Sequence, residues 1–149
     1  MNCPSLPSNS APTRRRTCEA GWTPPAQLLI LAIDDDGLIA DLIDLFKTDV
    51  ETGLQKMRAA LAAGDMPRIR AGAHSIRGSA MQVGADCLLD VCQELELASS
   101  LTPGSRHAEL VDRIQALFDE TASLMTSYSN ARQAVEGQRG PRPEVASYQ

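Results

Sequence analysis

The stretch Ala73–Glu96, AHSIRGSAMQVGADCLLDVCQELE, has the pattern of two helices joined by a tight turn. Gly84 interrupts the helical pattern, and Asp86 is a candidate N-cap for the segment that follows. Before Gly84, apolar or small residues recur every three or four positions, as on the buried face of an amphipathic helix: Met66, Ile69, Ala73, Ile76, Ala80 and Val83. The same spacing resumes after the turn with Leu88, Val91, Cys92 and Leu95.

His74 is the residue of this stretch with the clearest chemical potential. Residues three and four apart share a helix face, so His74 is expected to lie beside Arg77 and Gly78, with Arg70 one turn before it. At about 100° per residue, its ring lies about 120° from the middle of the buried stripe and should face water. An exposed imidazole has a neutral, nucleophilic fraction near neutrality, and a neighbouring arginine can stabilise a phosphoryl group.

Gly78 is a candidate for giving another protein access to this ring. Glycine inside a helix costs about 1 kcal/mol relative to alanine, so its presence calls for a reason. Without a side chain, Gly78 leaves space beside the imidazole for a foreign backbone and carboxylate.

Helical spacing continues on both sides of the stretch, and the sequence predicts an all-α protein. A short helix is expected over about 26 to 33, followed by four long helices over about 36 to 62, 65 to 82, 86 to 99 and 105 to 129. Glycine-containing breaks separate the long helices, so the connections are short. Successive helices are therefore expected to be antiparallel, in an up-down-up-down four-helix bundle with the short helix covering one end.

Composition is typical of one small domain between two tails. The 149 residues are 43% hydrophobic and only 3% aromatic, which suits one aliphatic core built from closely packed helices. We expect a flexible tail at 1 to 24, the bundle at 25 to 129 and a second flexible tail at 130 to 149. The net charge of -5 argues against nucleic acid as a partner, and the basic run Arg14–Arg16 is interpreted as part of the first tail.

The sequence gives no sign of a metal site or a membrane span. No pair among His74, His107 and the cysteines has the spacing of zinc ligands. The longest apolar run, Leu28 to Ile33, is far shorter than the roughly 20 residues that cross a bilayer, and it is too short and too late for a secretory leader. We therefore expect a cytoplasmic monomer in a reducing compartment, with no metal or cofactor.

In this helical order the motifs resemble a histidine-containing phosphotransfer (HPt) domain. The family's phospho-accepting helix and its turn resemble AAGDMPRIRAGAHSIRGSAMQVGA, and its next helix resembles LLDVCQELE. Its first long helix resembles DLIDLFKTDVETGLQKMRAAL. The resemblance covers about residues 27 to 128. It implies that His74 is the phosphorylation site and Gly78 the access glycine, while Arg77 stands where the family usually has lysine. Arginine keeps the charge but replaces a point charge with a planar fork.

The resemblance also implies a phosphoryl carrier and not an enzyme with its own ATP site. His74 would accept a phosphoryl group from a receiver-domain aspartyl phosphate and pass it to another receiver, in hybrid histidine kinases and response regulators, with Mg²⁺ bound to the receiver. No G-x-x-x-x-G-K-[ST] loop for ATP is present. Gln93 or Glu96 is expected to hydrogen-bond the ring from the next helix. The residues expected to contact the partner are Arg70, Ser75, Ser79, Met81, Gln82 and Gly84.

Other interpretations of these residues stay open. Leu29–Ile33 followed by Asp34–Asp36 resembles the first strand and acidic pair of a receiver domain, but no alternation of strands and helices follows, so we interpret the acids as a helix N-terminus. The bundle is alternatively a phosphate-independent interaction module that binds a kinase or a receiver. In a third interpretation His74 is the general base of a small hydrolase, which requires a nucleophile or an orienting carboxylate in a concave pocket.

Overall fold

The computed structural model describes residues 22–33, 35, 37–98 and 101–139. Five helices account for most of them: α1 (Ala26–Leu31), α2 (Leu38–Ala63), α3 (Met66–Val83), α4 (Asp86–Leu97) and α5 (Gly104–Arg139). No strand occurs in these described ranges. The prediction of an all-α protein is confirmed.

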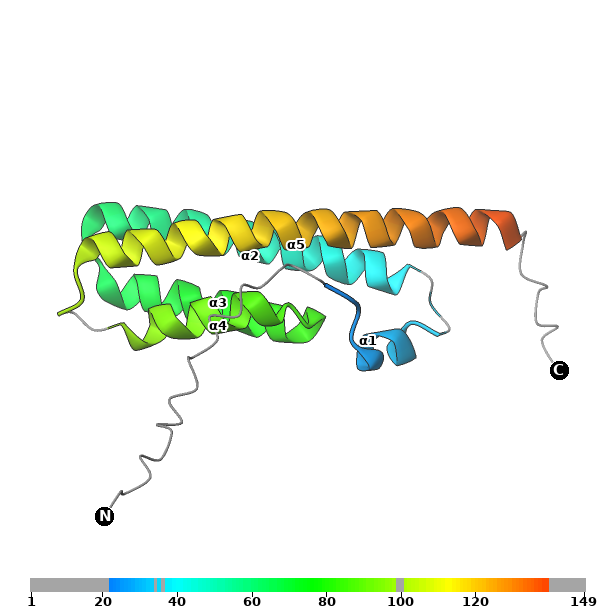
Figure 1. Cartoon of the computed structure of the whole chain (residues 1–149), viewed down its shortest axis with the longest axis horizontal. Helices are drawn as coiled ribbons and strands as arrows, with labels where there is room; N and C mark the ends of the chain where they lie inside the picture. The colour runs from blue at the N-terminus through cyan, green and yellow to red at the C-terminus, as the bar shows by residue number, and fades with distance from the viewer. Residues whose placement is uncertain (1–21, 34, 36, 99–100, 140–149) are drawn as a thin grey trace, which may run out of the picture.

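The four long helices form two layers. α2 and α5 lie side by side in one layer, α3 and α4 form the other, and the chain reverses direction at each connection (Figure 1). Contacts between α2 and α5 fit this antiparallel order, because Lys47 hydrogen-bonds Thr126 while Arg58, further along α2, pairs with Asp112, which lies earlier in α5. The arrangement places α3, which carries His74, between α2 and α4.

Short glycine turns set the limits of α3. Gly64 and Gly84 both adopt left-handed backbone conformations, with φ of 66° and 70°, and end α2 and α3. At the start of α3, Asp65 Oδ1 accepts a hydrogen bond of 3.2 Å from the Arg68 amide, which satisfies an otherwise unpaired helix donor. The predicted cap of α4 is wrong by one residue, because Ala85 is the N-cap and Asp86 is already helical, where its charge still complements the helix dipole.

The core is aliphatic apart from one aromatic pair. Phe46 of α2 and Phe118 of α5, the only phenylalanines of the chain, meet edge to face with ring centroids 5.9 Å apart. Between α2 and α3 the packing is tighter still. A Cβ on Gly53 would lie 2.8 Å from Ile76 Cγ1, and a Cβ on Gly72 would overlap Met57 Cγ. The two helices approach closely because these two positions carry no side chain.

The ends of the bundle differ from the expected limits. α5 continues to Arg139, ten residues beyond the predicted end at 129, through a segment rich in Ala, Arg and Gln whose described side chains are mostly exposed. At the same end of the bundle, Trp22 Nε1 donates a hydrogen bond of 2.8 Å to Val83 O at the end of α3, and its ring packs on Tyr128 of α5. The short helix α1 is confirmed and buries Leu28. Residues 1–21 and 140–149 of the expected tails, together with Asp34 and Asp36, lie outside the described residues.

Candidate functional site

His74 stands on the outer side of α3, where the sequence pattern placed it. The predicted buried stripe is confirmed for Ile69, Ala73, Ile76, Ala80 and Val83, all of which are buried. His74 follows Ala73 and therefore turns away from the core, with 71% of its side chain exposed. The ring is accessible to a second protein.

One carboxylate, Glu96 of α4, lies beside the ring. Glu96 Oε2 is 3.3 Å from His74 Nδ1. Of the two residues expected to reach the imidazole, the structure thus selects Glu96 and leaves Gln93 exposed. A carboxylate only accepts hydrogen bonds when ionised, so this contact favours the tautomer that carries its proton on Nδ1. The other ring nitrogen, Nε2, then carries the lone pair.

Arg77 is held next to the ring by the same carboxylate. Its Nε lies 3.1 Å from Glu96 Oε1, and its side chain is 32% exposed. The distance makes this an ion pair, but Oε1 is buried and has no aligned hydrogen-bond donor. The guanidinium therefore stays near His74 by charge attraction, without a directed hydrogen bond to Glu96.

Arg70, expected to flank the histidine, is engaged in the fold. Its Nη2 donates a hydrogen bond of 2.7 Å to the carbonyl oxygen of Ala98, directly after the C-terminus of α4. A cation at this end of a helix satisfies a free carbonyl group and complements the helix dipole. Arg70 therefore ties α3 to α4, and Arg77 is the arginine that shares a carboxylate with the ring.

The other residues expected at the contact surface differ in how open they are. Ser75, Met81 and Gln82 are exposed, Met81 to 66%. A Cβ on Gly78 would meet no atom of the described residues within 4 Å, so this part of the chain leaves the space beside the glycine open. Ser79 is half-buried and donates a hydrogen bond of 3.3 Å to Asp49, and Gly84 lies under Pro25 at the end of α3.

Comparison with protein families agrees with this arrangement. The Hpt domain model matches residues 41–124, more than half of the chain, and spans α2, α3, α4 and the first part of α5. The chain belongs to the Hpt domain family. Hpt domains are phosphotransfer modules of two-component systems, and they carry phosphoryl groups without an ATP-binding site of their own. Comparison with curated proteins and with solved structures gives no match.

A groove lies between α2 and α3 of the Hpt domain, on the other flank of α3 from Glu96. It has a volume of about 640 Å³, and its floor consists largely of glycine and alanine. Ser75, next to His74, lines it, together with the charged side chains of Asp49, Lys56 and Arg68. The sequence does not predict that these charged residues share a groove, because which residues of α2 and α3 face each other depends on how the two helices pack.

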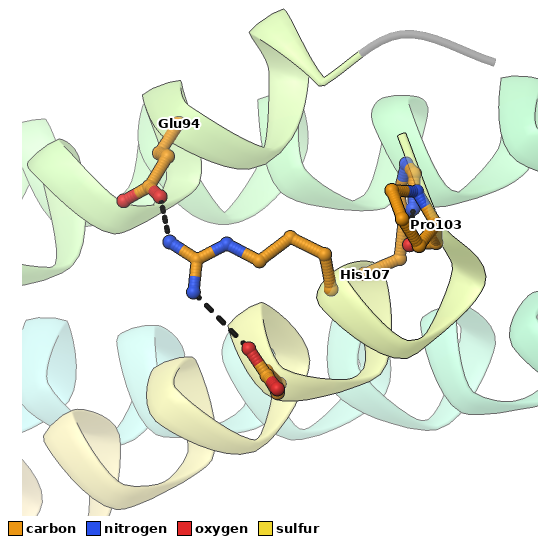
Figure 2. A network of polar contacts seen from close by, with 5 residues as sticks. Glu94, Pro103 and His107 are labelled. Atoms are coloured by element: carbon orange, nitrogen blue, oxygen red, sulfur yellow. Dashed lines mark hydrogen bonds and ion pairs between the residues drawn. The ribbon is translucent and has the colours of Figure 1, made fainter. Parts of the chain in front are cut away.

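The second histidine of the Hpt domain has a structural position. His107 is buried near the start of α5, and its Nδ1 lies 3.2 Å from Pro103 O (Figure 2). Next to it, Arg106 pairs with Glu94 of α4 and with Glu109. No group of three or more possible metal ligands occurs in the described part of the chain.

The cysteines bear on the expected reducing compartment. Among the described residues, Cys92 is free and buried, whereas Cys87 is disulfide-bonded. A disulfide is less usual in a reducing compartment, so the cytoplasmic location stays a prediction. None of the helices in the described ranges is long and apolar enough to cross a membrane.

Proposed function

We propose that His74 accepts a phosphoryl group from the aspartyl phosphate of one receiver domain and passes it to an aspartate of another. The observation that carries this proposal is an exposed imidazole whose Nδ1 faces a partly buried carboxylate on a neighbouring helix. A nucleophile oriented by such a third group is the arrangement expected of nucleophilic transfer. The receivers would belong to hybrid histidine kinases and response regulators, and the chain would act as a monomer.

The proposed transfer uses the two ring nitrogens differently. Nδ1 keeps its proton and donates a hydrogen bond to Glu96 Oε2, while the lone pair on Nε2 attacks phosphorus. The N–P bond forms as the P–O bond of the aspartyl phosphate breaks, and the electron pair of that bond returns to the receiver's carboxylate. The phosphorylated ring carries a positive charge, which the Glu96 carboxylate stabilises across the 3.3 Å contact. Transfer to the next receiver reverses these steps, and any Mg²⁺ belongs to the receiver.

Arg77 and Gly78 would serve the same step in different ways. The guanidinium of Arg77 can stabilise charge on the phosphoryl oxygens, which is a main source of catalysis in phosphoryl transfer. Gly78 leaves the approach to the ring open, since a side chain there would project into free space beside it. The phosphorus atom of the donor's aspartyl phosphate can then reach Nε2, with Nε2 opposite the P–O bond that breaks.

The docking surface would extend from His74 over the exposed part of α3. Met81 and Gln82 lie further along the helix, and Ser75 leads into the groove between α2 and α3. Met81 is a large apolar side chain exposed to solvent, as is common where proteins meet. Three further residues have contacts within the fold, and we place them at the edge of this docking surface: Ser79, Gly84 and Arg70.

Labelling with phosphorylated receivers tests this function directly. We expect a receiver that carries labelled phosphate to label the chain, and His74→Gln to abolish the labelling while the helix content stays unchanged by circular dichroism. The label should be lost in acid and survive alkali, as expected for phosphorus on an imidazole nitrogen.

A matched control is a histidine placed elsewhere on the surface. In the His74→Gln background, Gln133→His returns an exposed histidine on α5, and we expect no labelling of this variant. Labelling at position 133 would show that any exposed histidine reacts. A receiver that binds the chain but never labels it would overturn the proposal in favour of a phosphate-independent interaction module.

A further inference from the structure

Cys87, at the start of α4, is disulfide-bonded, and the other cysteines limit its partner. The chain has four cysteines. Cys87 takes part in a disulfide, while Cys92 is a free, buried thiol. Within one chain the partner is therefore Cys3 or Cys18, both of which lie outside the described residues. Either pairing would link the N-terminal segment covalently to α4.

Trp22 brings the chain that follows Cys18 to the end of α3. Its Nε1 donates a hydrogen bond of 2.8 Å to Val83 O. Cys18 precedes Trp22 by four residues, and Val83 precedes Cys87 by four. Because four extended residues span up to about 14 Å, the two cysteines can meet once this hydrogen bond has formed. Cys3 lies nineteen residues before Trp22, so the longer loop costs more entropy to close.

Two contacts with α5 place Cys87 and Trp22 on the same side of the bundle. Cys87 and Glu94 are seven positions apart, about two helix turns, so they share a face of α4. Glu94 pairs with Arg106 of α5. The ring of Trp22 packs on Tyr128, also of α5, with ring centroids 5.6 Å apart. The chain that leads to Trp22 and the Cys87 side of α4 are therefore both next to α5.

We propose that Cys18 and Cys87 form a thiol-controlled latch, a disulfide that holds the N-terminal segment on the bundle. The two sulfur atoms bond as two electrons and two protons pass to a small disulfide, such as oxidised glutathione, which leaves as two thiols. Reduction by two thiols reverses this exchange. In the reduced chain the segment keeps the noncovalent contacts of Trp22 and of Pro25, which packs over Gly84.

The latch leaves the His74 surface open. Cys87 and Glu96 are nine positions apart, two and a half helix turns, so they project from opposite sides of α4. Glu96 is the residue that contacts the His74 ring. Oxidation can therefore stabilise the bundle without covering the histidine. The latch does not depend on the proposed phosphoryl transfer.

Peptide mapping of the full chain tests the pairing. The chain is oxidised with glutathione disulfide, its remaining thiols are blocked with iodoacetamide in denaturant, and it is digested without reduction. Cleavage after arginine separates the two N-terminal cysteines, and cleavage before Asp90 separates the two on α4. We expect one linked pair of peptides, joined through Cys18 and Cys87. A link to Cys3, a link between two chains or blocked thiols at both positions would overturn the proposal.

Trp22 tests whether the disulfide holds the segment in place. Trp22 is the only tryptophan of the chain, so the quenching of its fluorescence by acrylamide reports on this contact. Reduction should increase the quenching and lower the melting temperature by about 5 to 15 °C, as expected for the loss of a native disulfide. Cys18→Ser should match the reduced chain under both conditions, and the control Cys3→Ser should match the full chain. Equal quenching and melting of the oxidised and reduced full chain would overturn the latch.

The rate of His74 phosphorylation tests whether the latch lies away from the histidine. The donor is phosphoramidate, which transfers its phosphoryl group as its P–N bond breaks and ammonia leaves. The rate, followed by intact mass, should differ by less than about twofold between the oxidised and reduced chains, as for sites without shared contacts. A larger difference would mean that the latch reaches the His74 surface, and its proposed position would be wrong.

Discussion

Two glycines on α3, six positions apart, have opposite surroundings. A Cβ on Gly72 would overlap Met57 in the contact with α2, whereas a Cβ on Gly78 would meet no atom within 4 Å. Both residues carry the same cost in helix propensity. The packing of α2 on α3 accounts for Gly72, but no contact among the described residues accounts for Gly78. One side of α3 is therefore fitted to its own fold, and the other is open at Gly78.

Ile76→Ala is expected to have the largest effect on the side of α3 that packs against α2. Ile76 is 1% exposed and lies against Gly53 of α2, so removing its side chain leaves a cavity that the close helix pair cannot fill. We expect a loss of about 2 to 5 kcal/mol in the free energy of unfolding, measured by chemical denaturation. Ser75→Ala, one residue away on the exposed side, should change it by less than about 0.5 kcal/mol. Similar losses in the two variants would contradict the division of α3 into two sides.

Gly72→Ala should destabilise the chain to a smaller extent. The added methyl group forces buried Met57 to move, which typically costs about 1 to 3 kcal/mol, while alanine recovers about 1 kcal/mol of helix propensity. We therefore expect a net loss of roughly 1 to 2 kcal/mol on denaturation. A more stable variant would mean that Met57 moves aside freely and that the helices are not locked at this point.

Gly78→Ala should have the opposite sign and separate stability from transfer. The methyl group points into open space and removes a helix glycine, so we expect a gain of up to about 1 kcal/mol in the free energy of unfolding. If a receiver needs that space, its rate of transfer to His74 should fall in the same variant. Unchanged transfer from receivers would show that Gly78 is not the access point.

Much of this contrast follows from the sequence alone. Regular apolar spacing and the Gly64 and Gly84 turns predicted α3 almost to the residue, and the angle of His74 from the buried stripe predicted its exposure. The extent of α5 was underestimated, because its last residues lack an apolar pattern and are helical by propensity.

Contacts between helices were less predictable. Three such contacts depend on how each helix is rotated and shifted against its neighbours. They are the contact of Glu96 with the His74 ring, the hydrogen bond of Arg70 at the end of α4, and the packing of Met57 at Gly72. Sequence spacing describes one helix at a time, so it gives the faces of α3 but not the partners that meet them.

Cys92 extends the comparison to a second nucleophile. Burial raises the pKa of the Cys92 thiol from 9.0 to about 12; the charge of Glu96 adds to this rise, and that of Arg77 opposes it. His74 and Cys92 thus lie near the same ion pair, one exposed and the other in the core. We expect Cys92 to resist alkylation by iodoacetamide at about pH 8 in the folded chain and to react in denaturant, as mapped by peptide mass spectrometry, because the thiolate is the reactive form.

The same shift in pKa predicts that stability depends on pH above 9.0. Above pH 9.0 the Cys92 thiol ionises in the unfolded chain, while in the folded chain it stays protonated up to about pH 12. Ionisation therefore favours the unfolded state, and the free energy of unfolding should fall as pH rises through this window. Because other groups also titrate in this pH range, the free energy of unfolding is measured against pH for both the full chain and Cys92→Val. We expect it to fall less steeply with pH in Cys92→Val. If the free energies of unfolding of the two proteins fall in parallel with pH, or if the folded chain is alkylated rapidly, the interface between α3 and α4 opens beneath Arg77 and Glu96. The contrast between a closed interior and an open His74 surface would then be wrong.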